Sequence, residues 1–172
     1  MPTVVIHCLL GSKGSETLGI LLSGLLEMRL DASIGYRSDP YCVVLLLPFP
    51  KTGLVIECLR SLKPDAVRPL LEAFLRRTDL FYWHLRIVAK RMGIITKKYK
   101  AGAPLRSLLN RYVDTIVGRE AMNEIFFEKL DVDAVKTFIH RLNVSNEIHL
   151  EKKYVSQPSP LAAAALNASR VY

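Results

Sequence analysis

A stretch of the sequence that could bind a polyanion lies between Asp79 and Asp114, where no acidic residue occurs. The chain has 24 Lys and Arg against 16 Asp and Glu, and without the eight basic residues of this stretch it is electrically balanced. The stretch therefore carries the whole net charge of +8, on Arg86, Lys90, Arg91, Lys97, Lys98, Lys100, Arg106 and Arg111. Because Lys and Arg release counterions when they neutralise phosphates, the sequence predicts a localised positive field suited to nucleic acid.

Aromatic residues accompany these charges. In a helix over this region Tyr82, Arg86 and Lys90 share one face, and Trp83 is interpreted as a core residue rather than a platform for a base. Tyr99 lies in a basic loop, where a ring stacked on an unpaired base contributes about 1–3 kcal/mol. The predicted core stripe of the same helix is Phe81, Leu85, Val88 and Met92. A solvated basic surface that only favours solubility is the alternative.

The segment Gly11-Ser12-Lys13-Gly14-Ser15 joins a strand-like run to a helical run, as a phosphate-binding loop would. It lacks the G-x-x-x-x-G-K-[ST] spacing that cradles a nucleotide. The favoured interpretation is a tight turn in which Ser15 caps the helix. The alternative is a weaker site in which the helix N-terminus and Lys13 hold one backbone phosphate without hydrolysing anything.

Signatures of catalysis or metal binding are missing from the sequence. The four histidines form no H-E-x-x-H pair, there is no G-x-S-x-G, and no Cys/His spacing suits zinc. Cys8, Cys42 and Cys58 lie in apolar runs and are predicted to be free, buried thiols. Glu120 and Glu124 are one helical turn apart and are interpreted as a helix face for ion pairing or interdomain docking. We expect no catalytic residue, no metal and no cofactor.

The elements that position these residues are predicted from apolar periodicity. Residues 3–10, 32–36 and 41–47 are strand-like, with a helix at about 15–29 between the first two. Ser38-Asp39-Pro40 is expected to form the turn between the last two strands. Helices are expected at 65–77 and at 79–92, the second ended by Gly93, whereas 53–62 is ambiguous between helix and strand. A further helix is expected from Pro104 onward, Gly118 separates it from one at 120–130, and Asp131 is expected to cap the helix that follows. Alternation of apolar and polar residues in 147–155 predicts a strand. That order of helices and strand also fits a winged helix, which remains a second candidate for DNA binding.

The predicted fold class is α+β, with an N-terminal β-α-β-β layer followed by a mainly helical region and a short C-terminal strand. Residues 1–172 are expected to form a single domain, with the layer at 1–50, the helical region at 51–143, and a strand and irregular tail at 144–172. A chain of 172 residues can bury roughly 70% of its unfolded surface, so it needs no disulfide. No apolar run approaches the ~20 residues of a membrane span, and the start does not fit a signal peptide, so a cytoplasmic location without membrane contact is expected.

Several short motifs resemble a known family. Val5-Ile6-His7, Gly11 and Glu16-Thr17-Leu18 resemble the strand-turn-helix opening of the DEAD/H-associated region of Lhr-type (large helicase-related) superfamily 2 helicases. Further similar motifs follow in the family's order over nearly the whole chain: Ser38-Asp39-Pro40-Tyr41, Arg86-Ile87-Val88-Ala89-Lys90-Arg91-Met92-Gly93, Asp114-Thr115, Arg119-Glu120-Ala121, Leu130-Asp131 and Ser159-Pro160-Leu161-Ala162.

The resemblance implies a 3′-to-5′ translocase in which this region follows the motor and helps to hold the loading strand. The chain itself has no Walker A sequence and no DEAD or DExH box, so it is not expected to hydrolyse ATP. We therefore expect a non-catalytic accessory domain that binds single-stranded or forked DNA or RNA beside helicase motor domains. The expected contacts are Arg86, Lys90, Arg91, Lys97, Lys98, Tyr99, Lys100 and Arg106.

A protein-interaction module is the alternative function. It would dock on a helicase core or a DNA repair partner through the face that carries Glu120 and Glu124. An enzyme that acts on bases is disfavoured, because no activated water, nucleophile or paired acid is visible.

Overall fold

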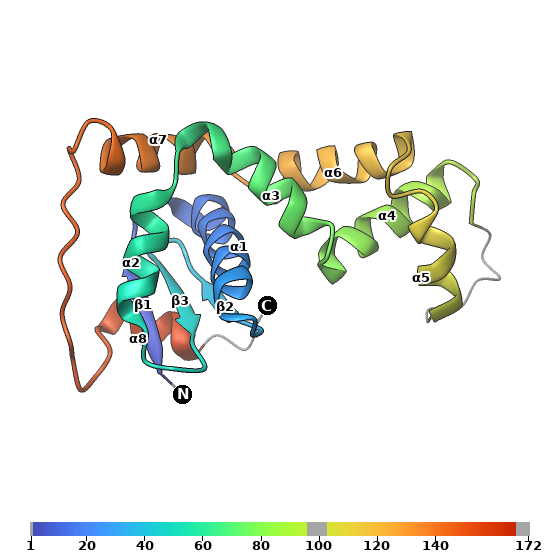
Figure 1. Cartoon of the computed structure of the whole chain (residues 1–172). Coiled ribbons are helices and arrows are strands. Elements are labelled where there is room, and N and C mark those ends of the chain that lie inside the picture. The colour runs from blue at the N-terminus through green and yellow to red at the C-terminus, as the bar shows by residue number, and fades with distance from the viewer. Residues whose placement is uncertain (1, 96–102, 168–172) are drawn as a thin grey trace. The chain divides into compact units, whose positions relative to one another are not determined.

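The structure is a computed structural model that describes residues 2–95 and 103–167. The chain divides into two compact units, one formed by Met1–Leu71 with Asp131–Tyr172 and the other by Glu72–Leu130. The first unit contains the sheet, and the second spans the whole basic stretch identified above (Figure 1). That residues 1–172 fold as a single domain stays a prediction.

A small antiparallel sheet forms the centre of the first unit. It consists of β1 (Thr3–His7), β2 (Gly35–Ser38) and β3 (Cys42–Leu46) in the order β1-β3-β2. The turn between β2 and β3 is held by Asp39, whose Oδ1 accepts hydrogen bonds from the backbone N–H of Tyr41 at 2.7 Å and of Cys42 at 2.8 Å. This is the local bonding that favours Asp in turns, and the predicted β-α-β-β opening is confirmed.

Two helices cover the sheet. Helix α1 (Gly11–Leu30) packs on β2 and β3, so closely that a Cβ built on Gly19 would lie 2.5 Å from the ring of Tyr36. The short α8 (Pro160–Asn167) also packs on β3 and β2, where Ala165 is buried with Cys42 and Val44 (Figure 1). Because side chains alternate along a strand, β3 can bury residues on both faces.

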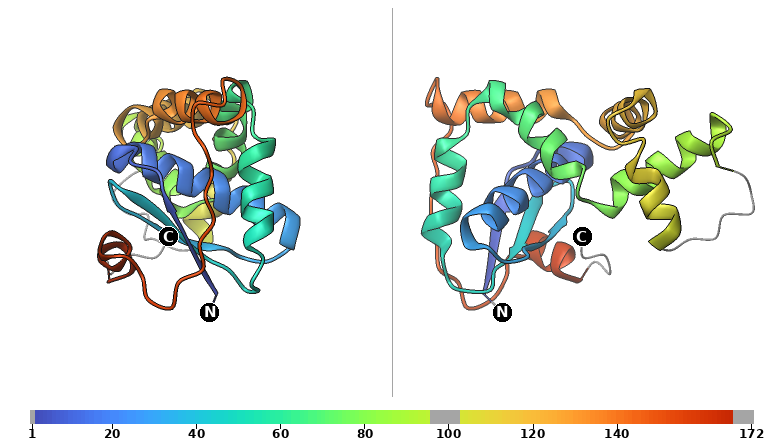
Figure 2. Two further views of the ribbon diagram at one scale, coloured as in Figure 1. Left: turned by 90° about the vertical axis from the view of Figure 1, so that its left-hand side faces the viewer. Right: turned by 45° about the vertical axis from the view of Figure 1, so that its right-hand side comes forward.

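Three further elements complete the first unit: α2 (Thr52–Ser61), the 3₁₀ turn η1 (Pro64–Ala66) and α7 (Val132–Asn143). The ambiguous segment 53–62 is therefore helical. The N-cap of α7 is Asp131, as predicted, with Oδ1 accepting from the Ala134 N–H at 2.9 Å. At its other end, the Asn143 side chain donates to the carbonyls that close α2, and Figure 2 shows the two helices meeting there.

The described residues of the second unit form helices joined by turns. Helix α3 (Val67–Leu75) leads into it from the first unit, and α4 (Asp79–Arg91) packs against both α5 (Ala103–Asn110) and α6 (Ile116–Glu128). Thr78 caps α4 by accepting from the Phe81 N–H at 3.3 Å. Gly93 follows α4 with φ +74, the left-handed conformation that the sequence predicts at a helix end. The centre of this unit lies between α4 and α6, where Leu85 and Ile125 are fully buried.

The predicted C-terminal strand is wrong. No residue of 147–155 pairs in a sheet in the described part of the chain. The alternation is real, because Ile148 and Leu150 are half-buried and His149 and Glu151 are exposed, but no neighbouring strand pairs with them there. The expected irregular tail contains α8 instead. Without a strand after α7, the winged-helix interpretation is also wrong.

Two helix boundaries differ from the prediction. Ser15 does not cap α1, because α1 begins at Gly11 and Ser15 is already buried inside it. Gly118 does not separate two helices; it lies in the first turn of α6, where its N–H donates to the Tyr112 carbonyl. A Cβ at this position would lie 1.9 Å from the carbonyl oxygen of Val113, so the close approach requires glycine.

Candidate nucleic-acid interface

The outer face of α4 gathers an aromatic ring and two cations. Trp83, Arg86 and Lys90 are three and four residues apart and fall on the side of α4 opposite the buried Phe81 and Val88. Across the described residues, neither Arg86 nor Lys90 forms an ion pair with a carboxylate. Lys90 is exposed, whereas Arg86 is half-buried.

Trp83 is exposed, and its interpretation as a core residue is wrong. Trp83 is 55% exposed, and its ring forms a T-shaped pair with the buried His84 ring, with 4.8 Å between the two centroids. The sequence contained a signal for this, because Trp83 lies two residues from both Phe81 and Leu85 and thus falls off the helical core stripe. A half-exposed indole beside two cations is an arrangement that can stack on an unpaired base.

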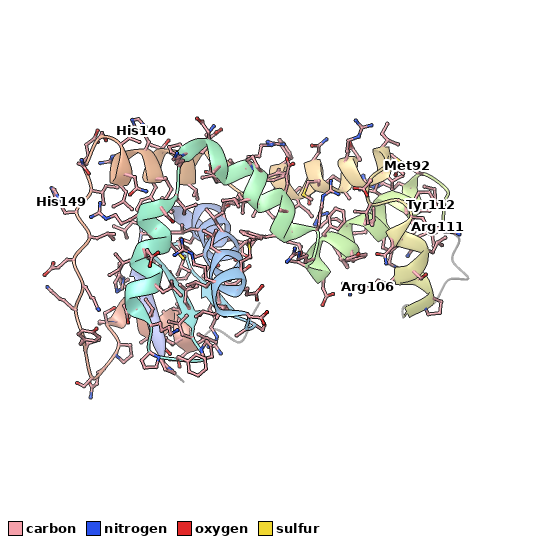
Figure 3. All side chains as sticks on the ribbon, in the orientation of Figure 1. Met92, Arg106, Arg111, Tyr112, His140 and His149 are labelled. Atoms are coloured by element: carbon pink, nitrogen blue, oxygen red, sulfur yellow. The ribbon has the colours of Figure 1, made fainter. Side chains whose placement is uncertain are left out.

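Met92 does not belong to the core stripe either. It is 46% exposed and lies just beyond the end of α4, at the position labelled in Figure 3. Helical spacing no longer determines the direction of a side chain after the helix has ended, which explains the difference. The other three predicted core residues of this stripe are buried, namely Phe81, Leu85 and Val88.

Arg106 is fixed between α5 and α4. Its guanidinium carbon lies 4.1 Å from the centroid of the Tyr82 ring, and its Nη1 lies 3.0 Å from Asp79 Oδ1. The Tyr82 hydroxyl in turn donates to Asn110 Oδ1 at 2.5 Å. Arg106 is labelled on α5 in Figure 3, and its side chain remains half exposed. Arg106, which is predicted to contact phosphate, is therefore held in place by Tyr82 and already ion-paired with Asp79.

Arg91 is also paired with a carboxylate. It forms an ion pair with Glu124 of α6, whose side chain is only 15% exposed. The other oxygen of Glu124 lies 3.6 Å from Nδ1 of His84, a fully buried ring. Glu124 thus faces the junction of α4 and α6, whereas Glu120 is exposed. The structure does not bring these two glutamates together on one exposed surface.

The remaining candidates are on other elements than α4 or lie beyond the described residues. Lys97, Lys98, Tyr99 and Lys100 fall outside the residues that the structure describes. Arg111 is exposed just after α5, and Lys13 is exposed in the first turn of α1, in the other unit. The described cations of the basic stretch are therefore Arg86 and Lys90 on the α4 face, the ion-paired Arg91 and Arg106, and Arg111.

The three cysteines are free thiols that differ in burial. Cys42 and Cys58 are buried thiols as predicted, whereas Cys8 is only partly buried. Burial raises the pKa of all three thiols, and that of Cys42 to about 12. Over residues 2–95 and 103–167, no group of three or more His, Cys, Asp or Glu could hold a metal ion. In the same residues, no helix is long and apolar enough to cross a membrane.

A family model described as DEAD/H associated matches residues 2–162. The chain belongs to the DEAD/H associated family. The match covers both units and includes α4, α5 and α6 in full. The resemblance seen in the sequence motifs is thereby confirmed.

Two relatives place this family region in Lhr-type helicases. The chain is 25% identical over 169 residues to the ATP-dependent helicase Lhr-Core protein 2 of Thermococcus barophilus, covering 91% of this chain and 19% of that protein. Its fold is similar, with a TM-score of 0.74 and 19% identity, to the structure of Mycobacterium smegmatis helicase Lhr bound to ssDNA and AMP-PNP, covering 94% of this chain and 22% of that one. The chain thus spans about a fifth of each relative, corresponding to a helicase-associated region and not to the core ATPase.

Proposed function

We propose that this chain is a non-catalytic accessory domain of an Lhr-type helicase that binds single-stranded or forked nucleic acid through its second unit. In this role the domain holds the strand beside helicase motor domains and does not hydrolyse ATP itself. It is consistent with the family and with the ssDNA-bound state of the mycobacterial relative.

The observation that carries the proposal is the outer face of α4. Trp83 supplies a stacking surface, and Arg86 and Lys90 supply cations one and two turns further along the helix. Trp83 and Lys90 are separated by about 10 Å along the axis, at about 1.5 Å per residue, so that they can engage successive parts of one strand. Phosphate contacts give no sequence preference, and an indole stacks on any base. We therefore expect binding that depends little on sequence.

The basic residues that follow α4 would extend this face. In the proposal, Lys97, Lys98 and Lys100 meet phosphates and Tyr99 stacks on a base. Single-stranded nucleic acid gives a slope of about −0.7 per phosphate contact when log K is plotted against log salt. About four contacts would give a slope of about −2.8.

A salt series with a charge-reversal variant tests the proposal. Binding of a fluorescently labelled single-stranded oligonucleotide is followed by anisotropy. The test variant reverses three lysines of the basic stretch, Lys97→Glu, Lys98→Glu and Lys100→Glu. The matched control reverses three exposed lysines outside the stretch, Lys51→Glu, Lys63→Glu and Lys129→Glu.

The two variants change the net charge equally, so they separate a local site from general attraction. We expect the test variant to lose binding and the control to keep most of it. Equal losses in both variants would contradict a defined site. Absent or salt-insensitive binding by the unmodified protein would overturn the proposal and favour docking.

Docking on a protein partner is the second candidate function, and the outer side of α6 favours it. Ile116 is 65% exposed and Phe127 is 84% exposed, and they lie on the same side of α6 as Glu120. Apolar side chains flanking a carboxylate suit a protein interface better than a phosphate backbone. Under this alternative, Phe127→Ala would weaken co-purification with the helicase motor, whereas variants of the α4 face would not.

A further inference from the structure

Arg106 has the features of an anion-binding site. Its guanidinium lies on the Tyr82 ring, with 4.1 Å between the guanidinium carbon and the ring centroid. The ring is held by the hydrogen bond from its hydroxyl to Asn110 Oδ1. A guanidinium fixed on an aromatic face loses little conformational freedom when it binds an oxyanion, and its planar fork matches carboxylate and phosphate alike. The site is therefore prepared for an acceptor before any ligand arrives.

The acceptor that occupies this site belongs to the chain itself. Asp79 Oδ1 lies 3.0 Å from Arg106 Nη1. The Asp79 side chain is 95% exposed, and Arg106 is 50% exposed. Exposed ion pairs are weak, since both charges remain in contact with water. An external phosphate can therefore displace this carboxylate without disturbing the helix core.

We infer that Asp79 occupies the position of a strand phosphate on Arg106 and so competes with nucleic acid for this arginine. The inference rests on the proposed nucleic-acid binding and deepens it, because it assigns Asp79 the role of lowering affinity at one contact. The ligand class is a phosphodiester of a single strand. Binding exchanges the Asp79 carboxylate for a phosphate oxygen on the same guanidinium.

This exchange has a measurable consequence for salt dependence. When a phosphate replaces Asp79, the released carboxylate attracts a cation from solution, which offsets the counterion that the phosphate loses. Asp79→Asn removes this compensation. The slope of log K against log salt should therefore steepen by about 0.7, the value of one single-strand contact. Affinity at a fixed low salt should rise about two- to five-fold, the range that a weak exposed ion pair corresponds to.

A double-mutant cycle isolates the pair from a general change of charge. Single-strand binding is measured for the unmodified chain, Asp79→Asn, Arg106→Gln and the double variant. Glu128→Gln is the matched control, because it neutralises another exposed carboxylate of the same unit. We expect the gain of Asp79→Asn to vanish in the Arg106→Gln background, and Glu128→Gln to change neither affinity nor slope appreciably.

Several outcomes would overturn the inference. The gain in single-strand affinity from Asp79→Asn would reflect a general charge effect if it persisted in the Arg106→Gln background. The same conclusion would follow if Glu128→Gln raised the affinity equally. No gain in Asp79→Asn would show that Asp79 does not compete. In each of these cases the proposed function stands if Trp83→Ala still weakens binding. Loss of all binding by the unmodified chain would instead refute the proposed function itself.

Thermal unfolding distinguishes competition from a structural role. Asp79 lies in the first turn of α4, where a carboxylate stabilises the helix. If Asp79 only joined α4 to α5, its replacement would lower the unfolding temperature and weaken binding together. The inference predicts a slightly lower unfolding temperature together with tighter binding, and weaker binding with the same loss of stability would contradict it.

Discussion

Replacing Trp83 by alanine should weaken binding of a single strand without changing its salt dependence. Stacking of a base on an aromatic side chain contributes about 1–3 kcal/mol, so the dissociation constant should rise roughly 5- to 150-fold. The indole carries no charge and meets no phosphate, so the slope of log K against log salt should stay the same. Lys90→Ala, by contrast, should change the salt dependence: it removes one phosphate contact, so the slope of log K against log salt should become shallower by about 0.7.

The fold should tolerate the Trp83→Ala change. The side chain is 55% exposed and its described ring contact is the edge of His84, so little buried surface is lost. Phe49→Ala is a matched control, because Phe49 is 56% exposed and lies in the other unit. It removes a comparably exposed aromatic side chain that is not on α4.

Two fluorescence signals report on this prediction. Trp83 is the only tryptophan of the sequence, so quenching of intrinsic fluorescence by an unlabelled oligonucleotide reports directly on its surroundings. Anisotropy of a labelled strand gives the affinity of both variants. Binding by Trp83→Ala within twofold of the unmodified chain, or an equal loss in Phe49→Ala, would refute the role of Trp83 as a stacking platform.

Other residues give predictions about stability and reactivity. Gly118→Ala should destabilise the protein by about 1–3 kcal/mol or more in denaturant unfolding, because the new Cβ would meet the Val113 carbonyl at 1.9 Å; unchanged stability would contradict this close approach. Asp131→Ala should cost about 1 kcal/mol through loss of the α7 cap, whereas Asp131→Asn should cost less, in the same assay. At pH 8, an alkylating reagent should modify Cys8 faster than Cys42, as followed by mass spectrometry, because Cys42 is fully buried and its pKa of about 12 leaves almost no thiolate. Both cysteines should react faster in denaturant. Faster modification of Cys42 than of Cys8 in the folded protein would refute the assigned burial.

Much of the local structure could be predicted from the sequence because its causes are local. The Asp39 turn, the Asp131 cap and the left-handed Gly93 each follow from bonding or backbone freedom within a few residues. The family was also recognisable, because its short motifs occur in order along the chain. Position along the chain likewise showed where the net positive charge is concentrated.

The candidate interface could be predicted only in part. Arg86 and Lys90 were expected on one helical face, and α4 does place them together. The partners of Arg106 and Arg91 were not foreseen, because Asp79 and Glu124 are 27 and 33 residues away along the chain. Pairs so distant in sequence meet only when helices pack, and periodicity within one helix contains no information about them.

The amino-acid sequence by itself determined the family, the α+β class, and the concentration of cations between two distant carboxylates. Only the tertiary structure decided that Trp83 is exposed, that Arg91 and Arg106 of the basic stretch are ion-paired with carboxylates, and that residues 147–155 form no strand. The physical reason is the same in each case. Exposure, ion pairing and strand pairing depend on which neighbour another part of the chain supplies, whereas turns, caps and charge density are properties of a few consecutive residues.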